Sequence, residues 1–339
     1  MRLVVVTQQV DPASPVLGAT VAKLRALAAR VDELVVLADS AVEGALPANA
    51  RVRLFRAPTK VGRGLRFETA LVSELSRRPR PAAVLAHMCP IYAVLSAPLA
   101  RPLGTRVLLW FTHWRASGLL RLAEGVSSTV VSVDRDSFPL DSAKLVAIGH
   151  GIDLADFPCA ERARDQGIRL LALGRTSPAK GLDTVIRAVA EVPESTLIAH
   201  GPSLTEDERR HRSELEQLVT ELGVRERVTL GEPVARERVP ELMAGVDALV
   251  NNMRAGATDK VVYEAAAACL PVLASNPGFA GLLPEALRFP REDAGVLAAR
   301  IRGLTELDLD SIGRELRAQV ARDHSVESWA ERVVELARR

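Results

Sequence analysis

Short apolar runs alternate with helical patterns along this chain, and the alternation occurs twice. In the first half we expect strands at 2–7, 34–38, 51–55, 83–86, 106–111, 129–133 and 145–148. In the second half we expect strands at 169–173, 196–200, 227–230, 247–251, 271–275 and 287–289. Strands that alternate with helices are typical of parallel sheets covered by helices. The sequence therefore predicts an α/β chain with two Rossmann-like α/β/α domains.

The composition changes between the two alternations. Residues 149–167 combine glycine, proline and mixed charge with little periodicity, which is typical of a domain junction. We expect domains at 1–155 and 156–322, followed at 323–339 by a helix that opens near Ser325 and crosses back to the first domain. Two such domains facing each other would bind a ligand in the cleft between them, at the carboxyl ends of the strands.

The composition also excludes several classes of protein. No apolar run reaches the roughly 18 residues that a membrane span requires, and the first strand follows Arg2 without a signal-peptide layout. We therefore expect a cytoplasmic protein. Neither half carries G-x-G-x-x-G after its first strand, and the chain has no P-loop sequence, which disfavours a nicotinamide or flavin enzyme. Cys89, Cys159 and Cys269 have no metal-like spacing, so we expect buried free thiols.

Positive charge is concentrated between Arg51 and Arg80. This stretch holds nine basic residues, opposed only by Glu68 and Glu74. It could be a docking surface for an anionic membrane or an anionic substrate, with the protein peripheral on the inner face of the membrane. The alternative is a solvated basic face without a partner.

A strand, a glycine-containing loop and a helix follow one another in "RLLALGRTSPAKGLDTVIRAV", residues 169–189. Gly174 and Gly181 allow close backbone approach, and a helix N-terminus near Leu182 attracts anions. Arg175 and Lys180 add two cations to the same loop, and Lys180 is one of only five lysines among 44 basic residues. This arrangement suits a diphosphate without a metal. The alternative is a solvated loop whose charges are incidental.

Glu264 stands in an otherwise small and apolar run within "DKVVYEAAAACLPVLASN". Burying an ionised carboxylate without a partner costs free energy, so we expect Glu264 to bind a ligand or a cationic side chain. We expect a helix that begins near Lys260 with Asp259 as its N-cap, which places Lys260 and Glu264 on one face. Glu264 could accept hydrogen bonds from vicinal hydroxyls such as those of ribose, or it could form an ion pair with Lys260 that serves only the helix.

These two segments, together with "GHGID", "HGP", "RVTLGE", "TQQVDPASPVLG" and "VLLWFTHW", resemble family 4 glycosyltransferases of the GT-B fold in their order and spacing. The resemblance covers nearly the whole chain. It implies transfer of a sugar from a UDP- or GDP-linked donor to an acceptor hydroxyl, with retention of anomeric configuration. The products would be cell-surface glycans, glycolipids or natural-product glycosides. No cofactor, metal or nucleic acid is implied, and the acceptor could be lipid-linked.

The resemblance also implies roles for individual residues. Arg175 and Lys180 would hold the donor diphosphate, Glu264 would hold the ribose, and His113 would lie near the sugar and the leaving diphosphate. The donor-binding positions that remain are Gly18, Gly174, Gly201, Gly256, Asp259, Lys260 and Val261.

One position departs from the family pattern. These enzymes usually carry two Glu separated by seven residues, and Gly256 stands where the first is expected. Asp259 and Lys260 are the nearest polar residues that could contact the transferred sugar. Two other functions therefore stay open: a nucleotide-sugar epimerase of the same fold, and a catalytically weak partner subunit that binds the donor.

Two D-x-D sequences, at 134–136 and 308–310, match the metal-binding motif of the other large glycosyltransferase fold. Two matches are unremarkable in a chain with 42 acidic residues, so we expect no metal.

Overall fold

The computed structural model describes residues 1–14, 17–160, 167–256 and 258–339. The chain divides into two compact units, which are described separately: Met1–Asp153 together with Asp323–Arg339, and Leu154–Arg322. Two stretches singled out in the sequence extend beyond the described residues. They are the junction at 149–167, which contains 161–166, and "TQQVDPASPVLG", which contains 15–16.

The first unit is built on a seven-stranded parallel sheet with the strand order β5-β3-β1-β6-β7-β8-β9. Its strands are β1 (Arg2–Val6), β3 (Glu33–Ala38), β5 (Ala50–Leu54), β6 (Ala83–His87), β7 (Arg106–Trp110), β8 (Thr129–Ser132) and β9 (Leu145–Ala147). β1 and β6 are buried along their whole length, which is why they appear in the sequence as continuous apolar runs. All seven strands expected in this half are confirmed. Two further strands of two residues each, β2 (Gln9–Val10) and β4 (Ser40–Ala41), pair beside the main sheet.

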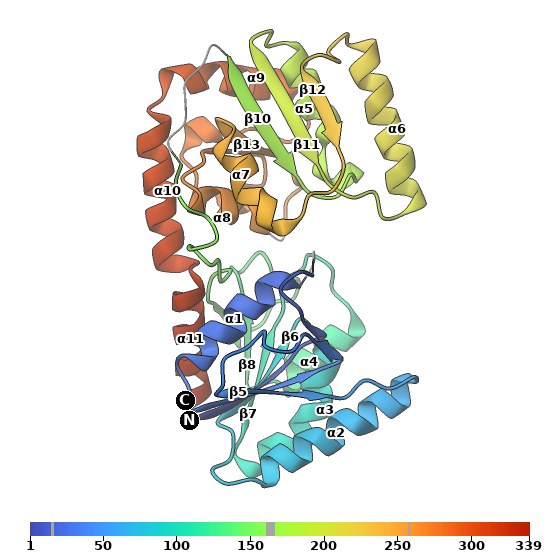
Figure 1. The fold of residues 1–339 in the computed structure, drawn as a ribbon, viewed down its shortest axis with the longest axis vertical. Coiled ribbons are helices and arrows are strands. Elements are labelled where there is room, and N and C mark those ends of the chain that lie inside the picture. Colours follow the sequence, from blue (N-terminus) through green and yellow to red (C-terminus); the bar gives the residue numbers. More distant parts are fainter. Residues whose placement is uncertain (15–16, 161–166, 257) are drawn as a thin grey trace. The chain divides into compact units, whose positions relative to one another are not determined.

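Helices cover both faces of this sheet (Figure 1). They are α1 (Gly18–Ala28), α2 (Lys60–Ser76), α3 (Pro90–Ala100), α4 (Gly118–Val126) and α11 (Val326–Arg338). One hydrophobic core joins the sheet to α2, α3 and α4 through side chains such as Phe67, Tyr92 and Leu120. α1 and α11 pack against each other on the other face.

The C-terminal segment is fastened to the first unit by its backbone and by a cap. Ile152 donates to the carbonyl of His324 at 2.7 Å, and Val326 donates to the carbonyl of Ile152 at 2.8 Å. The hydroxyl of Ser325 accepts from the backbone N–H of Ser328 at 3.1 Å, which confirms Ser325 as the N-cap of α11.

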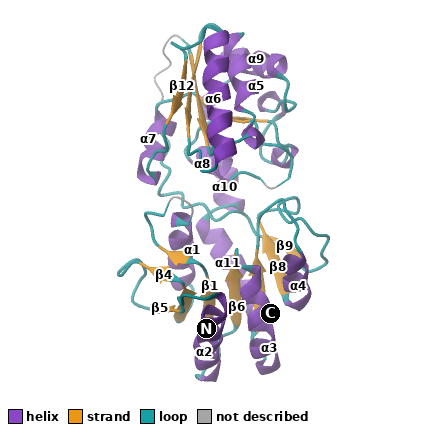
Figure 2. Ribbon diagram, turned by 90° about the vertical axis from the view of Figure 1, so that its right-hand side faces the viewer, coloured by secondary structure: helices purple, strands orange, loops and turns teal. Residues whose placement is uncertain are grey.

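The second unit is built on a five-stranded parallel sheet with the strand order β12-β11-β10-β13-β14. Its strands are β10 (Ile168–Leu173), β11 (Ser195–His200), β12 (Val228–Gly231), β13 (Ala248–Asn251) and β14 (Val272–Ala274). Its helices are α5 (Leu182–Ala190), α6 (Glu206–Glu221), α7 (Val239–Ala244), α8 (Lys260–Ala267), α9 (Ala294–Gly303) and α10 (Leu309–Asp323), the last of which ends in the first unit. α5 contacts both α6 and α9, and the three share one core with the sheet (Figure 2).

The strand expected at 287–289 is wrong. The chain forms a 3₁₀ turn at Glu285–Leu287, and only Arg288 makes an isolated bridge, to Ala274. Pro284 and Pro290 flank the run and leave little room for a strand. Leu287 and Phe289 are apolar because they are buried in the core of the second unit.

Candidate functional site

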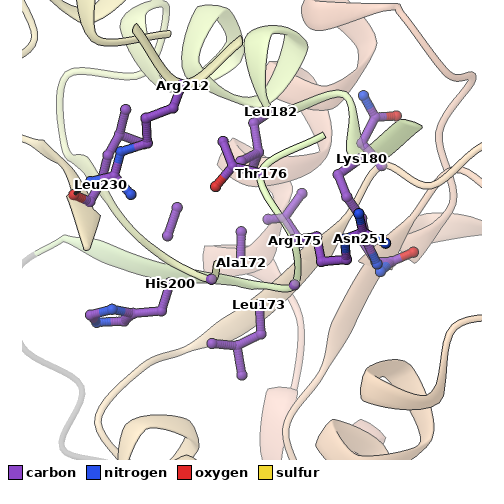
Figure 3. A pocket seen from close by; sticks show the side chains of 15 residues that line it. Ala172, Leu173, Arg175, Thr176, Lys180, Leu182, His200, Arg212, Leu230 and Asn251 are labelled. Carbon is purple, nitrogen blue, oxygen red and sulfur yellow. Dashed lines mark hydrogen bonds between the residues drawn. The ribbon is translucent and has the colours of Figure 1, made fainter. Parts of the chain in front are cut away.

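A pocket opens in the second unit at the carboxyl ends of β10, β11 and β13 (Figure 3). Open parallel sheets bind their ligands at this edge. The lining residues are Ala172, Leu173, Gly174, Arg175, Thr176, Lys180, Leu182, Ala199, His200, Gly201, Arg212, Leu230, Val250, Asn251 and Asn252. The structure thus places four of the predicted site residues in one cavity: Gly174, Arg175, Lys180 and Gly201.

Glycines bring the backbone together at this pocket. The Cβ of any other residue at position 201 would lie 1.7 Å from the carbonyl oxygen of Gly174, so only glycine fits. Gly174 itself has a φ of 140°, and a Cβ there would lie 2.9 Å from Cε of Lys180. α5 begins at Leu182 as expected, directly after the loop that holds Arg175 and Lys180.

The two cations of this loop are each paired with a carboxylate from elsewhere in the unit. Arg175 lies 2.6 Å from Glu208, which is almost completely buried and belongs to the capping box that begins α6. Lys180 is in direct contact with Asp259. Asp259 also accepts a hydrogen bond from Asn251 at 2.9 Å. The pocket therefore carries charges that are already neutralised in pairs.

Asp259 occupies the N-cap position of α8, as expected, but its side chain makes no capping hydrogen bond. The physical reason is competition, because the carboxylate faces Lys180 and Asn251 instead. Val261, the second residue of α8, is half-buried beside Lys260.

Glu264 on α8 is buried, and two cations meet it. Nη1 of Arg236 lies 2.9 Å and Nζ of Lys260 lies 2.7 Å from the same carboxylate oxygen, Oε1. In the described parts of the chain nothing bonds to the other oxygen, Oε2. The Lys260–Glu264 ion pair, which the sequence left open as the alternative to ribose binding, is therefore present, and Oε2 has no bond in the described chain.

Sequence reasoning missed Arg236, which begins a 3₁₀ turn at Arg236–Arg238 before α7. Besides Glu264, its guanidinium contacts Asp156 at 3.4 Å and lies over the ring of Phe157, 5.6 Å from the centroid. Nothing in the spacing of "ARERVPEL" indicates these contacts, because the partners lie in remote segments.

A disulfide joins Cys159 to Cys269, with 5.1 Å between the Cα atoms. The expectation of three free thiols is therefore wrong for this pair, and it is confirmed only for the buried Cys89. The two bonded cysteines are 110 residues apart, and their proximity results from folding rather than from any local spacing. The bond ties residues 154–159 to the end of α8.

Gly256 has a φ of 118°, a backbone conformation that residues with side chains rarely adopt. Its carbonyl accepts a long hydrogen bond from Asn276 at 3.4 Å. The loop before α8 is therefore shaped around glycine, so a glutamate at position 256 would be strained.

His113 and Gly18 belong to the first unit. His113 follows β7, and its Nδ1 accepts from the backbone N–H of Arg115 at 2.9 Å. Gly18 begins α1 and is buried, and its N–H donates to the carbonyl of Ser14 at 2.9 Å.

Three arginines of the basic stretch are used inside the first unit. Arg51, Arg53 and Arg77 all pair with Glu74, at distances of 2.6 to 3.2 Å. Glu74 is fully buried. Burial alone would raise the pKa of Glu74, but hydrogen bonds from Arg51 and Arg53, with their charge, outweigh it and lower the pKa from 4.5 to about 2.

In each D-x-D sequence, the first Asp accepts a hydrogen bond from a nearby backbone N–H. Asp134 accepts from the N–H of Ser137 at 2.6 Å, and Asp308 accepts from the N–H of Ser311 at 3.0 Å. Within the described residues, no group of three or more His, Cys, Asp or Glu side chains could hold a metal ion. None of the helices in the same part of the chain has the length and hydropathy of a membrane span.

Residues 158–302 match the model of the family described as glycosyl transferases group 1. A D-inositol 3-phosphate glycosyltransferase from Mycobacterium marinum is 28% identical over 237 residues, which are 63% of this chain and 50% of the relative. Its counterpart from Mycolicibacterium gilvum is 29% identical over 193 residues, covering 51% of this chain and 42% of the relative. The chain spans about half the length of these curated relatives.

Solved structures match the fold along the whole chain. HepE from Anabaena, in a complex with UDP, aligns with a TM-score of 0.80 and 17% identity over 99% of both chains. Sucrose-phosphate synthase from Thermosynechococcus elongatus aligns with a TM-score of 0.78 and 18% identity over 99% of this chain and 98% of the other. Residues 158–302 are thus similar in sequence to group 1 glycosyltransferases, and the chain as a whole has the GT-B fold of these solved structures.

Proposed function

We propose that this protein transfers a sugar from a UDP- or GDP-linked donor to an acceptor hydroxyl, with retention of anomeric configuration. The observation that carries the proposal is the pocket of the second unit, where Arg175 and Lys180 stand on one glycine-bounded loop at the carboxyl end of β10. Two cations beside the N-terminus of α5 suit a diphosphate. UDP in the complex of the similarly folded HepE is consistent with such a ligand.

In this proposal the donor diphosphate replaces the internal partners of the loop. Arg175 exchanges Glu208 for a phosphate oxygen, and Lys180 exchanges Asp259. Asp259, once released, can accept a hydrogen bond from a hydroxyl of the sugar. The two cations then neutralise the charge that develops on the leaving diphosphate as the bond to the anomeric carbon breaks. The leaving phosphate oxygen takes the proton of the acceptor hydroxyl.

No divalent metal is required in this mechanism, because the cationic loop does the work that a metal does elsewhere. Glu264 accepts from the ribose hydroxyls through Oε2. His113 lies near the sugar and the leaving diphosphate in this proposal, and Lys260 lies at the sugar end of α8. The loop at Gly256 lacks the usual carboxylate, so sugar recognition rests on Asp259 and Lys260.

A panel of nucleotide sugars tests this function. Free nucleotide is measured with and without acceptors, in EDTA and after addition of manganese. The acceptor panel includes inositol phosphate, because the curated relatives carry D-inositol 3-phosphate in their names. Acceptor-dependent release of UDP or GDP that persists in EDTA supports the proposal. Isomerised donor without transfer indicates an epimerase, and donor binding without turnover indicates a partner subunit.

We also propose that the acceptor is presented at an anionic membrane and that the N-terminal half of α2 docks there. Arg56, Lys60 and Arg66 are exposed in this region and form no ion pair within the described residues. Val61 and Leu65 stand beside them and are 74% and 60% exposed. Cations flanking exposed apolar side chains suit an anionic lipid surface.

A further inference from the structure

Arg236 contacts Glu264 from outside α8 and is held in turn by Asp156 and Phe157. Lys260 reaches Glu264 from the preceding turn of the same helix, a pairing common on helices. Arg236 instead comes from the segment between β12 and α7, 28 residues away in the sequence. It joins two parts of the second unit that meet only by folding.

We infer that Arg236 is a positioning residue that holds the carboxylate of Glu264 in the orientation required to bind the ribose of a nucleoside diphosphate. The inference rests on the proposed function, since it concerns the same donor. Both cations lie on Oε1, and nothing in the described chain bonds to Oε2. A carboxylate held by one oxygen has a fixed rotamer, and its second oxygen is presented to a ligand without loss of conformational freedom on binding.

Arg236 is itself held from its other side. Its guanidinium covers the ring of Phe157, which is buried, and contacts Asp156 next to it. The carbonyl oxygens of Phe157 and Ala267 both accept from the guanidinium of Arg317 on α10. Residues 154–159 are thereby fastened to α8, which carries Glu264. Arg236 lies between two fastened segments and cannot change its direction freely.

The same contacts predict which ligands are affected by the loss of Arg236. Glu264 is proposed to meet ribose hydroxyls, whereas Arg175 and Lys180 are proposed to meet the diphosphate. Loss of Arg236 should weaken the binding of UDP or GDP and leave the binding of inorganic diphosphate unchanged. A ribose contact is the same in the ground state and the transition state, so the donor KM should rise with little change in kcat.

The test measures the binding of UDP, GDP and inorganic diphosphate by calorimetry to the full chain and to three variants. Arg236→Ala should bind the preferred nucleoside diphosphate about tenfold more weakly, the loss expected when one charge-assisted hydrogen bond is weakened. Arg236→Lys should recover part of the affinity. The matched control is Arg238→Ala, because Arg238 lies two residues further on the same turn and pairs at the surface with Glu241 at 2.7 Å.

A double variant separates positioning from a direct contact between Arg236 and the nucleotide. If Arg236 acts through Glu264, then Arg236→Ala combined with Glu264→Gln should bind no more weakly than Glu264→Gln alone. Additive losses would overturn the inference. So would an equal loss of UDP and inorganic diphosphate affinity in Arg236→Ala, since a general collapse of the pocket would weaken both.

The failure of the inference differs from the failure of the proposed function. A wild-type protein that binds neither UDP nor GDP contradicts the proposed donor site. A wild-type protein that binds one of them, with unchanged affinity in Arg236→Ala, contradicts only the role of Arg236. If Arg236→Ala does not fold, Arg236→Lys and Arg236→Gln serve in its place, and full nucleoside diphosphate affinity in both would overturn the inference.

Discussion

The two units share one architecture, but they use their cations in opposite ways. In the first unit, Glu74 is fully buried and is surrounded by four arginines: Arg2, Arg51, Arg53 and Arg77. Arg2 is buried as well. In the second unit, Arg175 and Lys180 line an open pocket, and each is paired with a single carboxylate. The first arrangement is buried in the fold, whereas the second lines a pocket, and we propose that a ligand replaces its carboxylates. In this proposal the same residue types stabilise one unit and prepare the other for binding.

The rare lysines show the same contrast. Lys23 in the first unit is buried against the rings of Trp110 and Trp329, with Nζ 4.7 and 5.2 Å from their centroids. A desolvated cation against two aromatic rings contributes to the packing of α1 and α11. Lys180 in the second unit is partly exposed and faces Asp259. A lysine that is rare in a chain rich in arginine is therefore not by itself a sign of a ligand site.

The largest effect should come from the exchangeable cations. Lys180→Ala and Arg175→Ala should each lower turnover by roughly 10²-fold or more, because both are proposed to meet charge that grows in the transition state. The melting temperature should change little, because neither side chain is part of a core. Arg121→Ala is the control, since Arg121 is exposed on α4 of the first unit and its side chain has no partner within the described residues. Turnover close to wild type in either pocket variant would contradict the proposed site.

The next effect concerns the buried carboxylate of the first unit. Glu74→Gln should lower the free energy of unfolding by about 3 kcal/mol, because it leaves several arginines without their shared anion. The affinity of the second unit for a nucleoside diphosphate should stay the same. Denaturant unfolding measures the first quantity and calorimetry the second. A variant as stable as wild type would show that the arginines are solvated well enough without Glu74.

The pH dependence of stability sharpens this test. The pKa of Glu74 is lowered from 4.5 to about 2, so its contribution is complete above about pH 4.5 and is lost as the pH falls toward 2. Glutamine does not titrate, so the difference in unfolding free energy between wild type and Glu74→Gln should be large at pH 6 and small near pH 2. A difference that stays constant over this range would contradict the ionised state of Glu74.

The sequence could predict the strands because a buried parallel strand is a continuous apolar run, as in "LVVVT". It failed at 287–289, where an equally apolar run is buried as a 3₁₀ turn, and at β2 and β4, which are too short for any pattern. Loop 174–181 could also be located, since strand, glycines, cations and helix are adjacent in the sequence. The ion pairs that Glu208, Asp259 and Arg236 form with the site residues could not be predicted, because pairs between remote segments leave no local pattern in the sequence.

The disulfide should separate the two units in stability. Cys159 and Cys269 both belong to the second unit, and a cross-link that closes a long loop contributes about 2–4 kcal/mol. Cys159→Ser or a thiol reductant should therefore lower the melting temperature of the second unit. That transition is identified as the one that a bound nucleotide shifts upward. The transition of the first unit should not move. Cys89→Ala is the control for the reductant, because Cys89 is the buried free thiol of the first unit. Equal shifts in both units, or none, would contradict this assignment.

The smallest effect should be at the surface of the first unit. Each cation near an anionic bilayer contributes about 1 kcal/mol, so Arg56, Lys60 and Arg66 together should give weak and reversible binding. We expect association with anionic vesicles at low salt, none with neutral vesicles, and release when salt on the order of several hundred millimolar shortens the screening length. Sedimentation with vesicles measures each of these.

Reversal of Arg56, Lys60 and Arg66 to Glu should abolish vesicle binding and leave transfer to a water-soluble acceptor unchanged. The matched control reverses Arg314, Arg322 and Arg338, which are exposed on α10 and α11, so that the net charge changes equally. Loss of binding in both triple variants would indicate a general electrostatic attraction rather than docking by α2. Wild-type protein that ignores anionic vesicles at low salt would leave α2 a solvated face. The acceptor would then be a small soluble molecule, because the first unit would have no surface that brings it to a membrane.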